Sequence, residues 1–207
     1  MSERPQRFTD AEATIDWLID TVGHDIHVGA PLGLGKPATL LNALYARAKA
    51  NPEINLKILT ALSLDVPQAG SELERRIMDP IVERVFEDYP GLDYVRDLNA
   101  GTVPDNITIS EFFFQPGAML GNDDAQRHYR SVNYTHVARD LINAGVNVLM
   151  QMGAPGPDDS RFSLSSNTDV TLDLVPVVEA MRERGEPIWV VGQLNARMPM
   201  MTRSALV

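Results

Sequence analysis

The sequence predicts an α/β fold, in which a mostly parallel β-sheet is flanked by helices. Segments with strand-like and helix-like patterns alternate along the chain, which is typical of parallel sheets built from strand–helix–strand units. The strand-like segments are nearly continuous apolar runs, as expected for strands that are covered on both faces. A glycine-rich turn follows the first strand, and ligands bind at that end of such sheets.

Local signals set the expected limits of the elements in the first part of the chain. Thr9 and Glu12 fit a capping box that starts a helix, and Gly23 ends it. Pro37 suits the first turn of the next helix, because its missing N–H would have no partner there. A later helix should break near Pro80. We expect a helix over 9–22, a strand over 26–29, a turn over 31–37, a helix over 37–50, a strand over 54–64 and a helix over 71–90.

The second part of the chain continues the alternation. Turn residues predict a loop over 92–106 and a flexible turn over 153–161. Gly145 should end a short helix as its C-cap. The expected elements are a strand over 107–117, a helix over 137–145, a strand over 146–152, a helix over 170–185 and a strand over 186–194.

The composition is that of a globular domain. The chain has 207 residues, of which 44% are hydrophobic and 22% charged, which excludes a disordered tail, a collagen-like rod and a coiled coil. It has no cysteine, so disulfides and cysteine-bound zinc are excluded. The net charge of −10 argues against binding to nucleic acids and to anionic membranes.

Neither end of the sequence reads as a targeting or membrane segment. The polar N-terminus lacks the apolar core of a signal peptide, and no apolar run reaches the roughly 20 residues that span a bilayer. We therefore expect a cytoplasmic protein with no membrane partner. The chain closes on MPMMTRSALV directly after a strand, and we expect Met198, Met200 and Met201 to pack against a neighbour that this chain lacks.

The glycine-rich turn fits neither of two common nucleotide-binding motifs. A P-loop fails, because Ala30 replaces its first glycine and Pro37 follows Lys36. The dinucleotide fingerprint is half present in Gly33 and Gly35, but Pro37 and the lack of an acidic residue after the next strand count against it. Nucleotide binding is therefore disfavoured, and a tight turn that merely needs glycine stays open.

Four stretches of the chain carry a resemblance to a known family. They are VGAPLGLGKPATLLNALYARA, INLKILTALSLD, ITISEFFFQPGAMLGNDDAQRHYRSVNYTHVARDL, and GVNVLMQM followed by FSLSSNTDVTLDL, and they cover most of residues 26–174. In this order they resemble the N-terminal domain of the class I coenzyme A transferases, most closely the acetyl-CoA hydrolase/transferase branch. The resemblance implies two similar α/β domains with an active site between them, of which residues 1–207 are the first.

The resemblance also implies a reaction. A glutamate attacks a short acyl-CoA thioester and forms a glutamyl-CoA intermediate, which a second carboxylate or water resolves by transfer or hydrolysis. This chemistry belongs to acyl-CoA and acetate metabolism, with coenzyme A as a substrate and no tightly bound cofactor. The family's glutamate lies in a C-terminal domain, so we expect this chain to be inactive without that domain or a partner chain. A homo-oligomer is possible. The alternative is a non-catalytic module that binds acyl-CoA or a carboxylate.

The resemblance places the glycine-rich loop against the acyl site. Gly33 and Gly35 would let its backbone approach the substrate. Lys36 would meet a carboxylate or a CoA phosphate, or it is simply a solvated loop lysine. The predicted substrate-binding residues are Gly29, Gly33, Gly35, Lys36, Pro37 and Asn133.

No catalytic residue is expected within the chain, but Glu111, Tyr134 and His136 are candidates for lining the cleft between the domains. Burial of Glu111 beside three phenylalanines would raise its pKa. It would otherwise pair with a base, contact a helix cap, or lie at an edge in water. Asn133 or Thr135 would cap the following helix, and His136 could transfer protons. The histidines lack metal-ligand spacing, so no metal site is expected.

Overall fold

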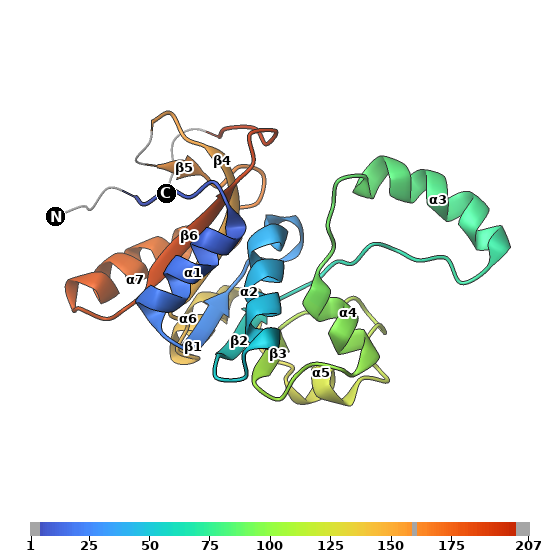
Figure 1. Cartoon of the computed structure of the whole chain (residues 1–207), viewed down its shortest axis with the longest axis horizontal. Coiled ribbons are helices and arrows are strands. Elements are labelled where there is room, and N and C mark those ends of the chain that lie inside the picture. The colour runs from blue at the N-terminus through green and yellow to red at the C-terminus, as the bar shows by residue number, and fades with distance from the viewer. Residues whose placement is uncertain (1–4, 159–160, 202–207) are drawn as a thin grey trace.

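A computed structural model of the chain describes residues 5–158 and 161–201, and it confirms the α/β fold with a mostly parallel sheet (Figure 1). The strands are β1 (Asp25–Gly29), β2 (Asn55–Thr60), β3 (Ile107–Glu111), β4 (Val148–Pro155), β5 (Phe162–Ser163) and β6 (Trp189–Leu194). The helices are α1 (Ala11–Val22), α2 (Ala38–Ala50), α3 (Glu72–Phe86), α4 (Asp93–Ala100), α5 (Asp123–Arg127), α6 (Val137–Asn143) and α7 (Thr171–Glu183), with two 3₁₀ turns, η1 (Gly33–Gly35) and η2 (Tyr134–His136).

The order of the strands locates the point where a ligand should bind. The strands run β3-β2-β1-β4, with β6 on the far side of β4, and all of these pairs are parallel. Only the short β5 is antiparallel, against the end of β4. The chain thus moves outward from β1 to β3 and then returns to the other side of β1. Loops at the carboxyl ends of β1 and β4 meet at this switch point, where open α/β sheets bind ligands.

Both faces of the sheet are covered, which explains the apolar strands. Helices α1, α2 and α4 pack on one face and share a core with alternate strand residues such as Val28 and Ile58. Helices α6 and α7 cover the other face, where Leu59 and Leu149 point. Successive residues of one strand therefore enter different cores, which explains why apolar residues stand next to one another along the central strands, as in Ile58-Leu59 of β2 and Val148 to Met150 of β4.

Several sequence-based boundaries were wrong. The predicted loop over 92–106 contains α4, whose buried Tyr94, Val95 and Leu98 complete the core under α2. Helix α3 is continuous through Pro80, although a proline cannot donate the intrahelical hydrogen bond. The N-cap of α1 is Asp10, whose side chain accepts from two backbone N–H groups in the first turn, and not Thr9.

The strands also end earlier or later than predicted. Strand β2 stops at Thr60 and β3 stops at Glu111, so Phe112 to Phe114 lie beyond the sheet. Strand β4 instead continues to Pro155, into the predicted turn, because β5 pairs with it. Residues 202–207 of the closing segment lie outside the described residues.

The contact between β1 and β4 requires a glycine at the end of β1. A Cβ built on Gly29 would lie 2.9 Å from Cδ2 of Leu149 and 3.2 Å from Cγ1 of Val146. We predict that Gly29→Ala lowers the free energy of unfolding by about 1–3 kcal/mol, because the added methyl overpacks the core. The matched control is Gly121→Ala, where no heavy atom lies within 4 Å. Denaturant unfolding of both variants measures the difference, and equal stabilities would contradict the prediction.

Candidate functional site

The glycine-rich loop joins β1 to α2 at the switch point and turns through η1. Gly33 has a φ of +55°, which a glycine adopts without strain, and its N–H donates to the carbonyl of Leu62 at 3.2 Å. The side chain of Asn167 lies against Gly35: a Cβ built on Gly35 would be 2.7 Å from Nδ2 of Asn167. The glycine at position 35 thus makes room for Asn167, which favours the tight-turn interpretation at that position.

Lys36 fastens the loop to the end of β2 and is not a solvated loop lysine. Its side chain is 2% exposed, and Nζ donates to the carbonyls of Ala61 at 2.5 Å and Leu62 at 3.3 Å. Burial lowers the pKa of Lys36 to about 8, while the carboxylates of Glu111 and Asp169 act in the opposite direction. The Lys36 ammonium is therefore buried, and it donates hydrogen bonds to the two backbone carbonyls that follow β2.

Glu111 ends β3, next to Thr60 of β2, and is 2% exposed. Burial raises the pKa of Glu111, and Ser63 and Lys36 partly offset this effect. Its Oε2 accepts the N–H of Ser63 at 3.3 Å, whereas Oε1 has no hydrogen-bond partner among the described residues. Glu111 is thus a buried carboxyl near Lys36 and not an edge residue in water.

A buried tyrosine completes this polar cluster beneath α4. Tyr94 is fully buried, and its hydroxyl lies 2.6 Å from Oγ of Ser63. Burial raises the pKa of Tyr94 well above its ordinary value, so the phenol stays neutral. Lys36, Ser63, Tyr94 and Glu111 therefore form a connected polar group on the α2 and α4 side of the loop; we call these four residues the polar anchor.

The segment between β5 and α7 holds the loop from its other side. Asp169 accepts the N–H of Leu32 at 2.6 Å and the hydroxyl of Tyr134 at 2.5 Å. Asn167 donates from Nδ2 to the carbonyl of Leu32 at 2.8 Å. Both backbone polar groups of Leu32 are thus bound by side chains that follow it by more than 130 residues.

The backbone is strained at the two positions that hold the loop. Leu62 and Asp169 have φ values of +44° and +46°, a region that residues with a Cβ seldom adopt. Leu62 accepts hydrogen bonds from Gly33 and Lys36, and Asp169 binds Leu32. A strained backbone persists only where the surrounding structure over-determines its conformation. Such positions cluster at active sites and at loops that clamp ligands.

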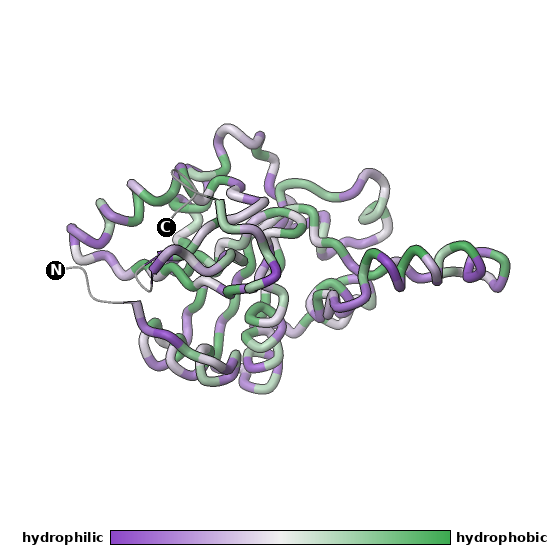
Figure 2. Tube along the Cα trace, turned by 90° about the horizontal axis from the view of Figure 1, so that it is seen from above, coloured by the Kyte–Doolittle hydropathy of each residue, from purple (hydrophilic) through white to green (hydrophobic). Residues whose placement is uncertain are grey.

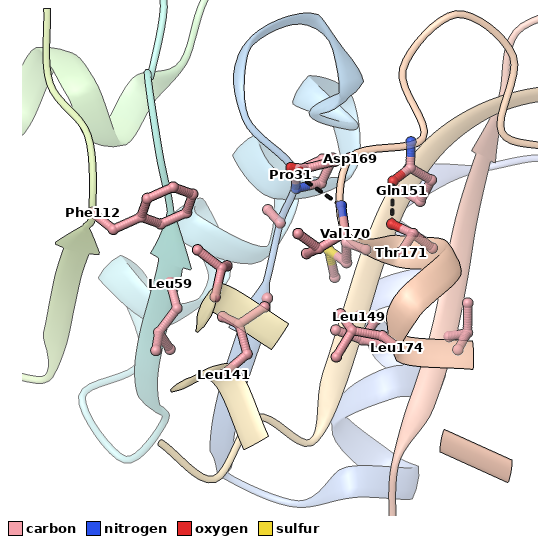
Figure 3. A pocket seen from close by; sticks show the side chains of 15 residues that line it. Pro31, Leu59, Phe112, Leu141, Leu149, Gln151, Asp169, Val170, Thr171 and Leu174 are labelled. Atoms are coloured by element: carbon pink, nitrogen blue, oxygen red, sulfur yellow. Dashed lines mark hydrogen bonds between the residues drawn. The ribbon is translucent and has the colours of Figure 1, made fainter. Parts of the chain in front are cut away.

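A small pocket lies at the same switch point (Figure 3). Its volume of about 20 Å³ is close to that of a single water-sized group. The wall is mostly apolar, with Gln151, Asp169 and Thr171 as its polar members, and Gln151 accepts the hydroxyl of Thr171 at 2.9 Å (Figure 3). The remaining lining residues are Gly29, Ala30, Pro31, Leu59, Phe112, Val137, Leu141, Leu149, Met150, Val170, Leu174 and Val190.

The structure brings some of the predicted residues together and separates others. Gly29 lines the pocket, Lys36 and Glu111 form part of the polar anchor, and Tyr134 reaches the loop through Asp169. Pro37 is buried just before α2, at its N-cap position. His136 is exposed and contacts none of these groups through a hydrogen bond.

The predicted helix cap before α6 was wrong. Oγ1 of Thr135 donates to Oδ1 of Asn133 at 2.7 Å, and both side chains are exposed. His136 occupies the N-cap position of α6 and makes no side-chain capping bond. Tyr134 to His136 form the 3₁₀ turn η2, and α6 begins at the next residue, Val137.

Sequence reasoning missed Asp169, Asn167, Ser63 and Tyr94. An Asn-Thr-Asp run before an apolar helix was a visible signal, but it reads equally well as local turn chemistry. Among the described residues, no group of three His, Asp or Glu side chains is arranged to hold a metal ion. Within the same residues, no helix has the length and apolar character needed to cross a membrane.

Comparisons with known proteins bear on this fold. No model of a protein family matches the chain, and no curated protein matches it. Among solved structures, the chain is similar to RipA from Yersinia pestis, with a TM-score of 0.60 at 17% identity, covering 96% of this chain and 39% of RipA. A RipA variant with a glutamate replaced by valine matches with a TM-score of 0.59 at 16% identity, covering 96% of this chain and 38% of the variant. The likeness establishes a shared fold, and the chain spans about two fifths of these RipA chains.

The burial of Lys36 predicts a pH dependence of stability. Between the pKa of about 8 in the folded protein and 10.5 in the unfolded chain, the unfolded chain binds more protons, so stability rises with pH. We expect Lys36 to raise the free energy of unfolding by about 1 kcal/mol from pH 8 to pH 9. Above pH 9 the rise is opposed, because burial raises the pKa of Tyr45, Tyr89, Tyr94 and Tyr134 in the folded protein, so these tyrosines ionise first in the unfolded chain. Lys36→Met should abolish the rise, whereas Lys57→Met, at a half-buried lysine of β2, should keep it. Urea unfolding across this range is the measurement, and a rise that survives Lys36→Met would contradict the assignment.

The close approach of Asn167 to Gly35 predicts a coupling between the two positions. Gly35→Ala should destabilise the protein by about 1–3 kcal/mol, because its methyl would meet the Asn167 amide at 2.7 Å. In an Asn167→Ala background the same substitution should cost about 1 kcal/mol less, since the nearest obstacle is gone. A double-mutant cycle measures the coupling, and strict additivity would show that the two residues do not contact each other.

Proposed function

We propose that this chain is the N-terminal part of an acetyl-CoA hydrolase or CoA-transferase that acts on short acyl-CoA thioesters. In this proposal the glycine-rich loop forms one wall of the acyl site. A glutamate of a downstream domain, or of a partner chain, forms the glutamyl-CoA intermediate, and coenzyme A is a substrate. The sequence resemblance supplies the reaction, and the held loop at the switch point is the observation that carries the proposal.

The loop has the form required to position an oxyanion donor. Lys36 holds one end of its turn and Asp169 holds the other, while Leu34 at the apex is 71% exposed. Among the described residues, the N–H of Leu34 has no hydrogen-bond acceptor. A rigid, unpaired N–H can stabilise the negative charge that develops on a thioester oxygen during acyl transfer. The apex is thus the part of this chain suited to contact the acyl group.

The other observations agree with an incomplete acyl site. Glu111 is too buried to attack a substrate, which supports a nucleophile outside this chain. The match to RipA covers about two fifths of that chain, as expected for one part of a larger protein.

Thiol release tests the proposal directly. The chain contains no cysteine, so a thiol reagent detects only the CoA released from acetyl-CoA. We expect no turnover by the chain alone, and turnover when the product of the downstream reading frame is added. In that assembly Leu34→Pro, which removes the N–H, should lower kcat by about 100-fold. Leu34→Ala keeps the N–H and is the matched control.

Three outcomes would argue against this assignment. Efficient turnover by the chain alone would place the nucleophile within it, and mass spectrometry would then locate the CoA adduct. Saturable calorimetric binding of CoA without turnover in the assembly would favour the non-catalytic binding module. Equal rates for Leu34→Pro and Leu34→Ala, with both variants folded, would remove the loop N–H from the mechanism.

A further inference from the structure

A second cavity lies over strands β2 and β3, on the face of the sheet to which Leu59 points. Its volume is about 350 Å³, which is within the range of sites that bind small molecules. Lys57 is in register with Thr108 and Leu59 with Ser110, so the two strands present these four side chains to the cavity on one face. Residues 127–130, at the end of α5, form the opposite wall. We call this cavity the basic hollow.

The basic hollow is distinct from the pocket at the switch point. Leu59 lines both cavities, so its side chain lies between them. Lys57 and Thr108 lie in the first halves of their strands, whereas the glycine-rich loop lies at the carboxyl ends. The hollow therefore extends away from the edge of the sheet that the acyl-CoA proposal uses.

The hollow is positively charged, although the chain has a net charge of −10. Lys57, Arg127 and Arg130 line it, and no carboxylate does so among the described residues. Asp140 neutralises Arg130, because its two oxygens accept hydrogen bonds from Nε at 2.5 Å and from Nη2 at 2.8 Å. The side chains of Lys57 and Arg127 make no ion pair or hydrogen bond within the described part of the chain. Two cations thus line the hollow without a partner.

The position of Lys57 is unusual for an unpaired cation. It lies on β2, an inner strand between β1 and β3, and its neighbours Leu56 and Ile58 are fully buried. Lys57 itself is half-buried, so its side chain has lost part of its contact with water. Lys36 compensates its burial with two carbonyl acceptors, whereas Lys57 has none. An anion in the hollow would supply the missing partner.

The segment that carries Arg127 is tied to the neighbouring strand. Oγ of Ser110 donates to the carbonyl of His128 at 2.7 Å, and the N–H of Arg130 donates to the last carbonyl of β3 at 2.9 Å. Oδ1 of Asp124, which does not line the hollow, lies 3.2 Å from Nδ1 of His128. A wall that is held in this way is already in place when a ligand arrives, which lowers the entropic cost of binding.

We propose that the basic hollow binds the phosphate group of a small phosphate monoester. Such a group carries a charge of about −1.5 to −2 at pH 7 and three acceptor oxygens. Lys57 and Arg127 match this charge, and the guanidinium of Arg127 can bind two phosphate oxygens at once. The hydroxyl of Thr108, beside Lys57, makes no hydrogen bond within the described residues and can donate to the third oxygen.

The size of the hollow favours an ester over free phosphate. A free phosphate would occupy only a small part of a cavity of about 350 Å³, so the remaining space takes the esterified group. The ring of Tyr129, which lines the hollow and is 45% exposed, offers that group an apolar surface. This inference does not depend on the acyl-CoA proposal.

Titration calorimetry of the intact chain with ribose 5-phosphate tests the proposal. We expect saturable binding with a Kd of about 0.1–1 mM, at least about fivefold weaker binding of inorganic phosphate, and no binding of ribose. Lys57→Met and Arg127→Gln should each raise the Kd at least about tenfold, because each removes one of the two unpaired cations. Arg127 is exposed, so its replacement leaves the fold intact.

Arg76→Gln is the matched control for the change in net charge. Arg76 is exposed on α3, which projects from the body in both views (Figure 1 and Figure 2). This variant should keep the Kd within about twofold. Three results would overturn the proposal: no saturable binding of ribose 5-phosphate up to about 20 mM, an Arg127→Gln variant that binds as tightly as the original chain, or inorganic phosphate that binds as tightly as the ester.

Discussion

One buried ammonium organises the carboxyl edge of the sheet. Lys36 leaves the loop after β1, satisfies two carbonyls beyond β2 and lies in the field of Glu111 at the end of β3, so one side chain connects three adjacent strand ends. Removing the Lys36 ammonium from water costs free energy. Its hydrogen bonds to two carbonyls and its attraction to the nearby carboxylates are both needed to offset that cost. The conformation of the loop therefore depends on charges that are distant in the sequence.

The two sides of the loop are held by different chemistry. The polar anchor acts from the α2 and α4 side through a charge, whereas Asp169 and Asn167 act from the α7 side through hydrogen bonds to the backbone of Leu32. What remains exposed between them is the backbone and side chain at Leu34. A loop fixed in this way loses little entropy when a ligand binds, because its conformation is already set.

The sequence was informative wherever the signal was local. Apolar periodicity and turn residues located β1, α2, β2 and α7, since the side chains that decide those elements lie within a few residues of one another. Helix α4 was missed because only three apolar positions mark it, and the surface that buries them is on the distant α2. The glycine loop and Lys36 stood out in the sequence. Two contacts beside the loop could not be predicted: Asn167 fills the space next to Gly35, and Asp169 binds Leu32. Each contact joins residues more than 130 positions apart, and no local sequence pattern reports such a contact.

The excursion that carries α3 leaves and rejoins the body at neighbouring points. The hydroxyl of Tyr89, just after α3, donates to the carbonyl of Leu64, just before it, at 2.9 Å. Because the two ends already meet, changing the length of the chain between them costs little closure entropy, about 0.6 kcal/mol for each doubling. Insertions, deletions or a different helix in this segment leave the register of the sheet and the loop at the switch point intact. Evolution can therefore alter the outer surface of this protein and the carboxyl edge of its sheet independently.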